Sequence, residues 1–434
     1  MKGRLSLRAG LVFWLFLLSA IAFLDRTNVS IAGPHISSEY ALGNVRLGWV
    51  ISAFLVGYAA VQILAGWLAV RLGPRRALTL GVIWWGIFTL GTSLVPTGMY
   101  GALWALIAIR FALGVGEAII YPASNQFVTR WIPIKERGTV NGVIFAGVGA
   151  GAGLTPPLLV AIITSYGWRA AFWFSAVVGI VAGWIWYLIA RDTPDEHPRI
   201  SPQELHKIHA ETTPASAAPA AKKRVPWGAI FRSRTLLLLT FTYFSFGYVA
   251  WIFLGWFYMY MAQARGLNLK ESAFYTMLPF LAMTVFCLVG GILVDWITAH
   301  YGLRVGRCGP GFVSFLLTAA LLVVGSRVAG ASVAAVTLAA GAGALYISQS
   351  SFWSVTADIA GQNAGVVSGV MNMGAQIGGA VTASLTPWIA QQFGWTSSFA
   401  VAAVLAVAGA ISWLGVDPNC RLDDTGVPDD SCVS

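Results

Sequence analysis

Charged side chains are scarce in this sequence: only 10% of its 434 residues are Asp, Glu, Lys or Arg, whereas 57% are hydrophobic. In an average soluble domain about a quarter of the residues are charged. The mean hydropathy of +0.72 points in the same direction. This composition excludes an ordinary soluble globule and predicts an integral membrane protein.

Cysteine and histidine are also rare, with four and five residues respectively. Cys287, Cys308, Cys420 and Cys432 lack the spacing of metal ligands, so we expect free thiols, no metal site and no cofactor. The chain also lacks HExxH, GxSxG and phosphate-binding loop motifs, which mark common classes of enzyme. We therefore do not expect an enzyme.

Long apolar runs are what the sequence does contain, and runs of about 18 residues or more have the length that crosses a bilayer. Twelve such runs, bounded by Gly, Pro or charged residues, predict an all-α membrane protein with twelve transmembrane helices. They cover approximately residues 11–33, 47–70, 76–95, 100–126, 139–162, 169–190, 234–262, 273–296, 309–327, 331–355, 364–389 and 396–415.

The 27 basic residues are unevenly distributed between the two sides of these spans. With the N-terminus inside, 20 of them fall in cytoplasmic segments, five fall in outer segments, and Arg26 and Arg110 lie within the membrane. This positive-inside asymmetry predicts that both termini are cytoplasmic. It also explains the pI of about 9.6 without a nucleic-acid partner, so we expect none.

The chain repeats itself at an offset of 227 residues. The glycine pattern at 138–142 recurs at 365–369, and the loop at 166–172 recurs at 393–399, while the proline-rich gap 191–233 separates two sets of six spans. Such parallel repeats predict a binding site near the midplane between the halves. We predict an N-terminal six-helix bundle over 1–190, a cytoplasmic linker loop over 191–233, a C-terminal six-helix bundle over 234–415 and a cytoplasmic tail over 416–434.

The stretch LDRTN at 24–28 places Asp25 and Arg26 side by side within the first apolar run. A charged residue near the centre of a transmembrane helix costs about 2.5–3.5 kcal/mol on insertion scales, so such residues normally face a bundle interior or a water-filled cavity. We expect both residues to mark a substrate or ion path. A structural ion pair is the alternative.

Arg110 and Glu117 lie seven residues apart in the fourth span, so they share one helix face about 10 Å apart along the axis. Asp25 and Glu117 are the two carboxylates deep in the predicted spans, and they are our candidates for proton coupling because removal from water favours the neutral carboxyl. Arginine keeps its proton but binds carboxylates in a bidentate manner, so we assign Arg26 and Arg110 to a substrate anion. A pair that only holds the bundle together is the alternative for Arg110 and Glu117.

The loop GWLAVRLGPRR at 66–76 resembles the cytoplasmic gate motif of major facilitator superfamily transporters, and GILVD at 291–295 resembles its second-half copy. Val70 stands where the superfamily has an acid, which weakens the usual contacts of that acid with a helix dipole and arginines. Positive-inside anchoring is the alternative role of the arginines. The resemblance implies gating roles for Gly66, Arg71, Gly73, Arg75, Arg76, Gly291 and Asp295.

Within that superfamily the chain is most similar to the anion:cation symporter family, which takes up sugar acids and other organic anions with protons. The resemblance rests on LDRTN at 24–28, RFALGVGE at 110–117 with the following Tyr121-Pro122, PDEHPRIS at 194–201 with Glu204, and VPW at 225–227. It implies the major facilitator fold. It also implies that Arg26 is the principal anion ligand and that Arg110 alternates between substrate and Glu117.

The same resemblance places sugar-acid contacts at six polar or amphipathic residues. Polar side chains also hold helices together in lipid, which is the alternative for each of them. Phe23 stands where relatives commonly have tyrosine, and this leaves a less polar substrate, such as an aromatic acid, open. The six residues are Tyr58, Gln349, Ser350, Trp353, Asn372 and Gln376.

We therefore predict a secondary active importer of a small organic anion, such as an aldonate, a hexuronate or another carboxylate, that works by proton symport and alternating access. Protons on Asp25 and Glu117 would free the arginines for the anion, whereas the empty, deprotonated protein would pair these acids with the arginines. We expect a monomer in a bacterial-type inner membrane whose partners are the anion, protons and lipid.

Two alternatives remain. One is a drug:proton antiporter of the same fold, although residues 147–157 lack the Gly-Pro order of the antiporter motif. The other is a membrane-embedded enzyme or sensor, which the missing catalytic motifs and the short, proline-broken central loop make less favourable.

Overall fold

The computed structural model describes residues 7–211, 227–267 and 269–422. Within these ranges the chain is helical, with short 3-10 and π-helical turns and no β-strand. Residues 212–226 of the predicted linker and 423–434 of the predicted tail lie outside the described residues.

The cysteines differ in part from the prediction. Cys287 and Cys308 are free and buried, but Cys420 is disulfide-bonded, so the prediction of a free thiol is wrong there. Cys420 lies beyond the last helix, where helical geometry no longer limits which parts of the chain can meet. Cys432 lies outside the described residues.

The first half of the chain forms a bundle of long apolar helices, whose backbone groups must be paired within each segment because lipid offers no hydrogen bonds. Gly73, with φ 78°, and Pro74 at the start of a helix produce the sharp turn after the second span. The helices are α1 (Leu7–Glu39), α2 (Gly43–Ala60), α3 (Gln62–Leu72), α4 (Pro74–Leu94), α5 (Ala102–Glu117), α6 (Ile120–Trp131), α7 (Arg137–Tyr166) and α8 (Trp168–Ile189).

The second half forms a matching bundle, and two short helices, α9 (Pro202–Glu211) and α11 (Trp227–Arg232), precede it. Gly302, with φ 86°, turns the chain at the position that corresponds to Gly73 in the first half. The helices are α12 (Arg234–Gly255), α13 (Phe257–Met259), the π-helical turn η3 (Tyr260–Ala264), α14 (Leu269–Tyr301), α15 (Leu303–Arg327), α16 (Ala331–Ile347), α17 (Gln349–Ala360), α18 (Ala364–Phe393) and α19 (Trp395–Trp413).

Among the described residues, ten helical segments are long and apolar enough to cross a membrane, and the pair α2 and α3, bent by 53°, makes an eleventh. One of the ten, Ala331–Phe393, has 63 residues. At 1.5 Å per residue it would be about 95 Å long, more than twice a bilayer. It breaks at Gly361, which has φ 50°, and therefore provides two spans. The predicted twelve-helix architecture is confirmed.

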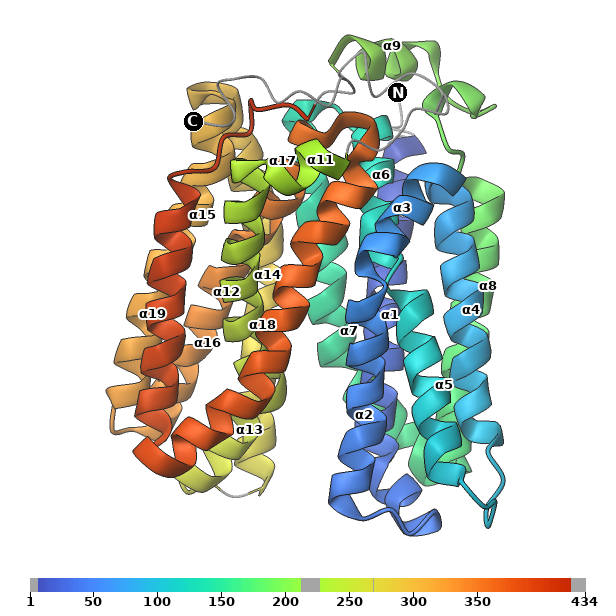
Figure 1. The fold of residues 1–434 in the computed structure, drawn as a ribbon, viewed down its shortest axis with the longest axis vertical. Helices are drawn as coiled ribbons and strands as arrows, with labels where there is room; N and C mark the ends of the chain where they lie inside the picture. The colour runs from blue at the N-terminus through green and yellow to red at the C-terminus, as the bar shows by residue number, and fades with distance from the viewer. Residues whose placement is uncertain (1–6, 212–226, 268, 423–434) are drawn as a thin grey trace, which may run out of the picture.

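The two bundles stand side by side, and the start of α1 and the end of α19 lie with α9 at one end of the molecule, here called the terminal end (Figure 1). At this end α3 packs against α18 and α7 packs against α14. Gly66 meets Gly365, and Gly138 meets Gly291, so closely that a Cβ on Gly66 or Gly291 would clash with the opposing backbone. The halves are thus pressed together at the terminal end.

Candidate functional site

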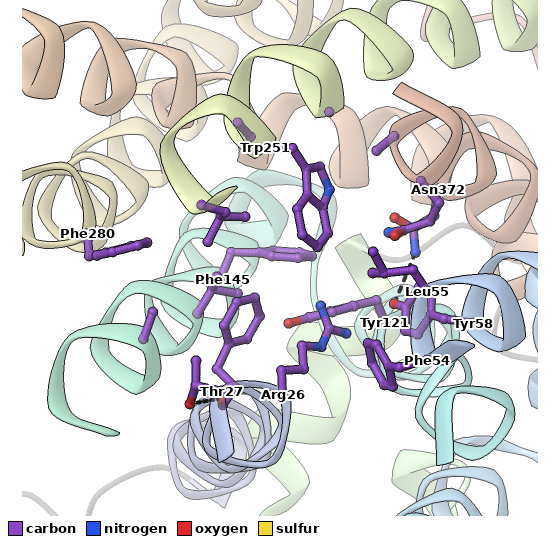
Figure 2. Close-up of a pocket in the computed structure, with 18 of the residues that line it drawn as sticks. Arg26, Thr27, Phe54, Leu55, Tyr58, Tyr121, Phe145, Trp251, Phe280 and Asn372 are labelled. Carbon is purple, nitrogen blue, oxygen red and sulfur yellow. Dashed lines mark hydrogen bonds between the residues drawn. The ribbon is translucent and has the colours of Figure 1, made fainter. Parts of the chain in front are cut away.

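A cavity of about 370 Å³ lies between the two halves, and both contribute to its walls. Its size is typical of a site for a small molecule. Arg26 extends into it from α1, with Phe145 on one side, Phe54 and Tyr58 on the other, and Trp251 of the second half opposite (Figure 2).

Within the described part of the chain, Arg26 is one of the two charged residues that line this cavity. Its Nε donates to Glu117 Oε1, and its guanidinium carbon lies 4.7, 5.5 and 4.9 Å from the ring centroids of Phe23, Phe54 and Tyr58. Such an aromatic cage attracts a cation through the ring quadrupoles. Arg26 Nη2 is buried without a hydrogen-bond partner, so a donor is left over for a ligand.

Arg110 lies beside it, lines the same cavity and is only 1% exposed. Its guanidinium carbon is 5.1 Å from the centroid of the Phe54 ring, so both guanidinium groups lie over this one ring. Arg110 Nε and Nη1, and Glu117 Oε2, are buried without partners. A buried ionised group without a partner is costly, so these atoms have the capacity to take up further hydrogen-bond partners.

Close helix packing and a proline position these side chains. Gly57 meets the backbone of Phe111, and Gly114 meets that of Phe54, which draws α2 against α5. The span then breaks between α5 and α6 because Pro122 cannot donate a hydrogen bond to the carbonyl of Ala118. Gln62 Nε2 supplies this bond instead, at 3.1 Å.

Asp25 does not line the cavity. It is 1% exposed, and Thr89 Oγ1 of α4 donates to its Oδ1 over 3.0 Å, while Oδ2 has no partner. The expected pairing of an acid with an arginine is therefore present for Glu117 with Arg26, whereas Asp25 is held by a hydroxyl. Asp25 still interacts electrostatically with Glu117 and Arg110.

Of the six weaker predicted contacts, Tyr58, Gln349, Asn372 and Gln376 line the cavity. Asn372 Nδ2 donates to Tyr58 Oη over 3.4 Å and so joins the two halves. Ser350 and Trp353 are buried but are not among the lining residues. Trp353 lies behind the wall, where its Nε1 donates to Tyr243 Oη over 3.1 Å.

Sequence reasoning missed the aromatic wall. Phe54, Phe145, Tyr243 and Phe246 line the cavity, yet each looks like an ordinary apolar residue of a span. Tyr121, which follows the charged motif at 110–117, also lines the cavity, although its place in the sequence predicts no role. Only its neighbour Pro122 offered a signal, because it predicts a break in the helix.

A second cluster of charges closes the terminal end. Asp358 accepts from Arg137 Nη1 at 2.7 Å and from Arg307 Nε at 2.9 Å, and Arg307 Nη1 donates to Asp295 Oδ1 at 3.0 Å. Arg137 belongs to the first half and the other three residues to the second. The sequence did not single out Arg137, Arg307 or Asp358, because charges at span ends look like membrane anchors.

Three of the seven predicted gating residues lie on this interface between the halves. Asp295 accepts hydrogen bonds from the backbone N–H groups of Gly138 and Thr139, at 2.8 and 2.6 Å, at the N-terminus of α7. An acid at a helix N-terminus is stabilised by the helix dipole. Gly66 and Gly291 form the glycine contacts described above.

The other four predicted gating residues lie against the first half. The Arg75 backbone N–H donates to Asp192 Oδ1 at 2.9 Å, and its Nε donates to the carbonyl of Tyr187 at 2.8 Å. Gly73 packs against the carboxylate of Asp192, Arg71 lies over Trp67, and Arg76 is exposed. Burial raises the pKa of Asp192 above its usual value, opposed by the bond from Arg75 and by the charge of Arg130.

Gln126 does for the N-terminus of α18 what Asp295 does for that of α7, although Val70 is the repeat counterpart of Asp295. Gly365 N–H at the start of α18 donates to Gln126 Oε1 at 3.0 Å, and Gln126 Nε2 donates to the carbonyl of Gln362 at 3.0 Å. Val70 lies beside Gly365 but offers it no acceptor. The N-terminus of α18 is therefore capped by a neutral amide from α6, whereas the N-terminus of α7 is capped by the Asp295 carboxylate from α14.

Comparison with known proteins agrees with this geometry. Residues 15–383 match the family described as Major Facilitator Superfamily. The chain is 34% identical to the "Probable sulfoacetate transporter SauU" of Cupriavidus necator, over 98% of this chain and 97% of that one. It is 28% identical to the "Hexuronate transporter" of Bacillus subtilis, over 92% of each chain. The proton:xylose symporter XylE has the same fold, with a TM-score of 0.76 at 14% identity, over 94% of this chain and 96% of that one.

The family match and the transporters among the relatives show that this protein is a transporter rather than an enzyme. This chain belongs to the Major Facilitator Superfamily. The predicted resemblance is confirmed, and the anion transporters among the relatives agree with the anion:cation symporter type.

Proposed function

We propose that this protein imports a small organic anion by proton symport across a bacterial-type inner membrane. The observation that carries the proposal is the pair Arg26 and Arg110, which present three buried, unpartnered nitrogens to one cavity between the halves. Two guanidinium groups are well suited to the two oxygens of a carboxylate. The relatives named for sulfoacetate and hexuronate support an organic anion as substrate.

Glu117 couples the proton to the anion. In the empty, deprotonated protein its carboxylate accepts a hydrogen bond from Arg26, and the bond between them in the structure supports this. A proton on Glu117 removes this competing charge and frees Arg26 for the anion, and the uncharged acid lowers the cost of moving the loaded site through the membrane. Asp25 lies close enough to act electrostatically on Glu117 and is the second proton site.

Movement of the two halves then exposes the cavity to either side in turn. The contacts at the terminal end, including the bonds of Asp358 and the glycine pairs, support a state closed at that end. With both termini in the cytoplasm this state faces outward. Import requires that these contacts break once anion and proton are bound. We propose that one chain suffices, because one chain contributes both walls of the cavity.

The test is the pH change outside proteoliposomes when sulfoacetate, hexuronates, aldonates, dicarboxylates or aromatic acids are added. We expect one class to make the outside more alkaline in the wild type and to have no effect in Arg26→Ala. The loss should be at least about tenfold in affinity, because a hydrogen bond to a charged group contributes about 1.5–3 kcal/mol and 1.4 kcal/mol corresponds to a factor of ten. Uptake that survives in Arg26→Ala would refute the proposal, and proton release on addition of a cationic drug would indicate the antiporter.

A further inference from the structure

We propose that the substrate of this cavity is an aromatic monoanion: one carboxylate on a flat ring, rather than a polyhydroxylated sugar acid. This inference rests on the proposed function, because it names the substrate class of the same site. Ten of the 27 residues that line the cavity are aromatic.

The aromatic residues form two walls that come from different halves. In the first half, Tyr121 and Phe145 are stacked, with centroids 4.7 Å apart and planes at 19°. In the second half, Tyr243 and Phe246 are stacked with centroids 5.1 Å apart and planes at 19°, and Tyr346 lies 5.1 Å from Phe246. A flat ring between such walls gains stacking or edge-to-face contacts in addition to burial of its surface.

Several polar groups of the cavity are engaged with one another or with groups behind its wall. Tyr243 Oη already accepts from Gln349 Nε2 at 3.0 Å and from Trp353, Tyr121 Oη bonds to the Ser19 hydroxyl at 3.2 Å, and Tyr58 accepts from Asn372. The hydroxyls of a sugar acid would have to break these bonds or share the acceptors left over, such as the buried, unpartnered Gln349 Oε1, and any hydroxyl left unpaired is costly. An apolar ring leaves the bonds intact.

The cationic residues of the cavity determine where the substrate places its carboxylate and how many carboxylates it can carry. Arg26 and Arg110 are the cationic residues among those that line the described cavity, and both lie over Phe54. Their free N–H groups can donate to one carboxylate at that end. The wall of the second half presents Gln349, Asn372 and Gln376, which are neutral, so a second carboxylate would find no cation there.

The experiment compares four probes on the purified wild-type protein by titration calorimetry at one pH. Benzoate carries the proposed features, cyclohexanecarboxylate has the same charge and ring size without an aromatic face, glucuronate adds hydroxyls, and phthalate adds a second carboxylate. We expect benzoate to bind at least about tenfold more tightly than each of the others. Equal or tighter binding of glucuronate would overturn the inference.

Two variants on α12 test the wall directly. Phe246→Leu should weaken benzoate binding about tenfold while the affinity for cyclohexanecarboxylate changes little. Phe241→Leu is the matched control, because that side chain is 43% exposed and does not line the cavity, and it should bind benzoate like the wild type. An equal loss for both probes in Phe246→Leu would contradict the aromatic contact.

The outcomes separate this inference from the proposed function. If glucuronate or sulfoacetate binds in an Arg26-dependent way and benzoate does not, the aromatic substrate class is wrong and the anion importer stands. If none of the anions binds to wild-type protein, the anion importer fails and the inference fails with it.

Discussion

Glu117 interacts with both cavity arginines, with Arg26 through a hydrogen bond and with Arg110 electrostatically. One of its oxygens accepts from Arg26, and the other is buried without a partner, as are two nitrogens of Arg110. An ionised group in this position is stable only while opposite charges surround it. Binding of a substrate anion therefore adds a negative charge to this site, and a proton on Glu117 can compensate for it.

The variant Glu117→Gln should separate binding from coupling. The amide mimics the protonated acid, so Arg26 stays available and exchange of labelled anion across the membrane persists at a rate within about threefold of wild type. Accumulation driven by a pH gradient should be lost, because no proton moves with the anion. Both rates are measured in proteoliposomes.

Glu39→Gln is the matched control for this acid. Glu39 pairs with Arg169 at 2.7 Å, at the end of α1 away from the cavity. We expect it to retain both exchange and accumulation. Full accumulation by Glu117→Gln would show that another group carries the proton.

At the scale of helices, the pair α3 and α18 depends on the absence of side chains at its contact. A Cβ on Gly66 would clash with the backbone of Gly365, whereas nothing lies within 4 Å of a Cβ added at Gly153 in α7. Gly66→Ala should prevent full closure of the terminal end and reduce transport at least tenfold. Gly153→Ala should transport normally. Equal rates in the two variants would mean that this contact is not needed for closure.

The cap of α18 gives a second test at this scale. Gln126→Leu removes the acceptor for Gly365 N–H, which should cost about 1 kcal/mol, as the loss of other helix caps does, and shift the open-to-closed ratio about fivefold toward opening at the terminal end. An acid at position 70 would stand beside Gly365 as Asp295 stands beside Gly138. The double variant Val70→Asp with Gln126→Leu should therefore restore the ratio. If the double variant does not restore the ratio, an acid at position 70 is not equivalent to Asp295.

At the scale of the whole molecule, the two ends of the cavity differ in access. Ser30 lines the cavity and is exposed, whereas Thr356 lies fully buried at the closed terminal end and accepts a hydrogen bond from Asn125 at 2.9 Å. In a background with the four native cysteines replaced by serine, an impermeant maleimide should modify Ser30→Cys from outside intact cells and leave Thr356→Cys unmodified. When Gly66→Ala is added and the reagent is applied to inverted vesicles, Thr356→Cys should be modified and Ser30→Cys should not. Labelling of Ser30→Cys only from the cytoplasmic side would reverse the proposed orientation.

The sequence by itself determined the class of the protein, because apolar runs of bilayer length and a positive-inside charge pattern are properties of composition and order alone. It also drew attention to Arg26 and Arg110, which line the cavity, and to Glu117, which bonds to Arg26, because charge in an apolar span is rare. The seven-residue spacing was sufficient to place Arg110 and Glu117 on one face.

Only the tertiary structure decided which apolar residues face the cavity and which face lipid. Phe54 carries two guanidinium groups while Phe13 is 55% exposed on the outside of α1. In the membrane both surroundings are apolar, so hydrophobic periodicity cannot distinguish them. The same holds for Asp25, whose carboxylate bonds to α4, and for Gln126, whose partner Gly365 lies 239 residues away along the chain. Such contacts arise from the packing of distant helices and have no local pattern in the sequence.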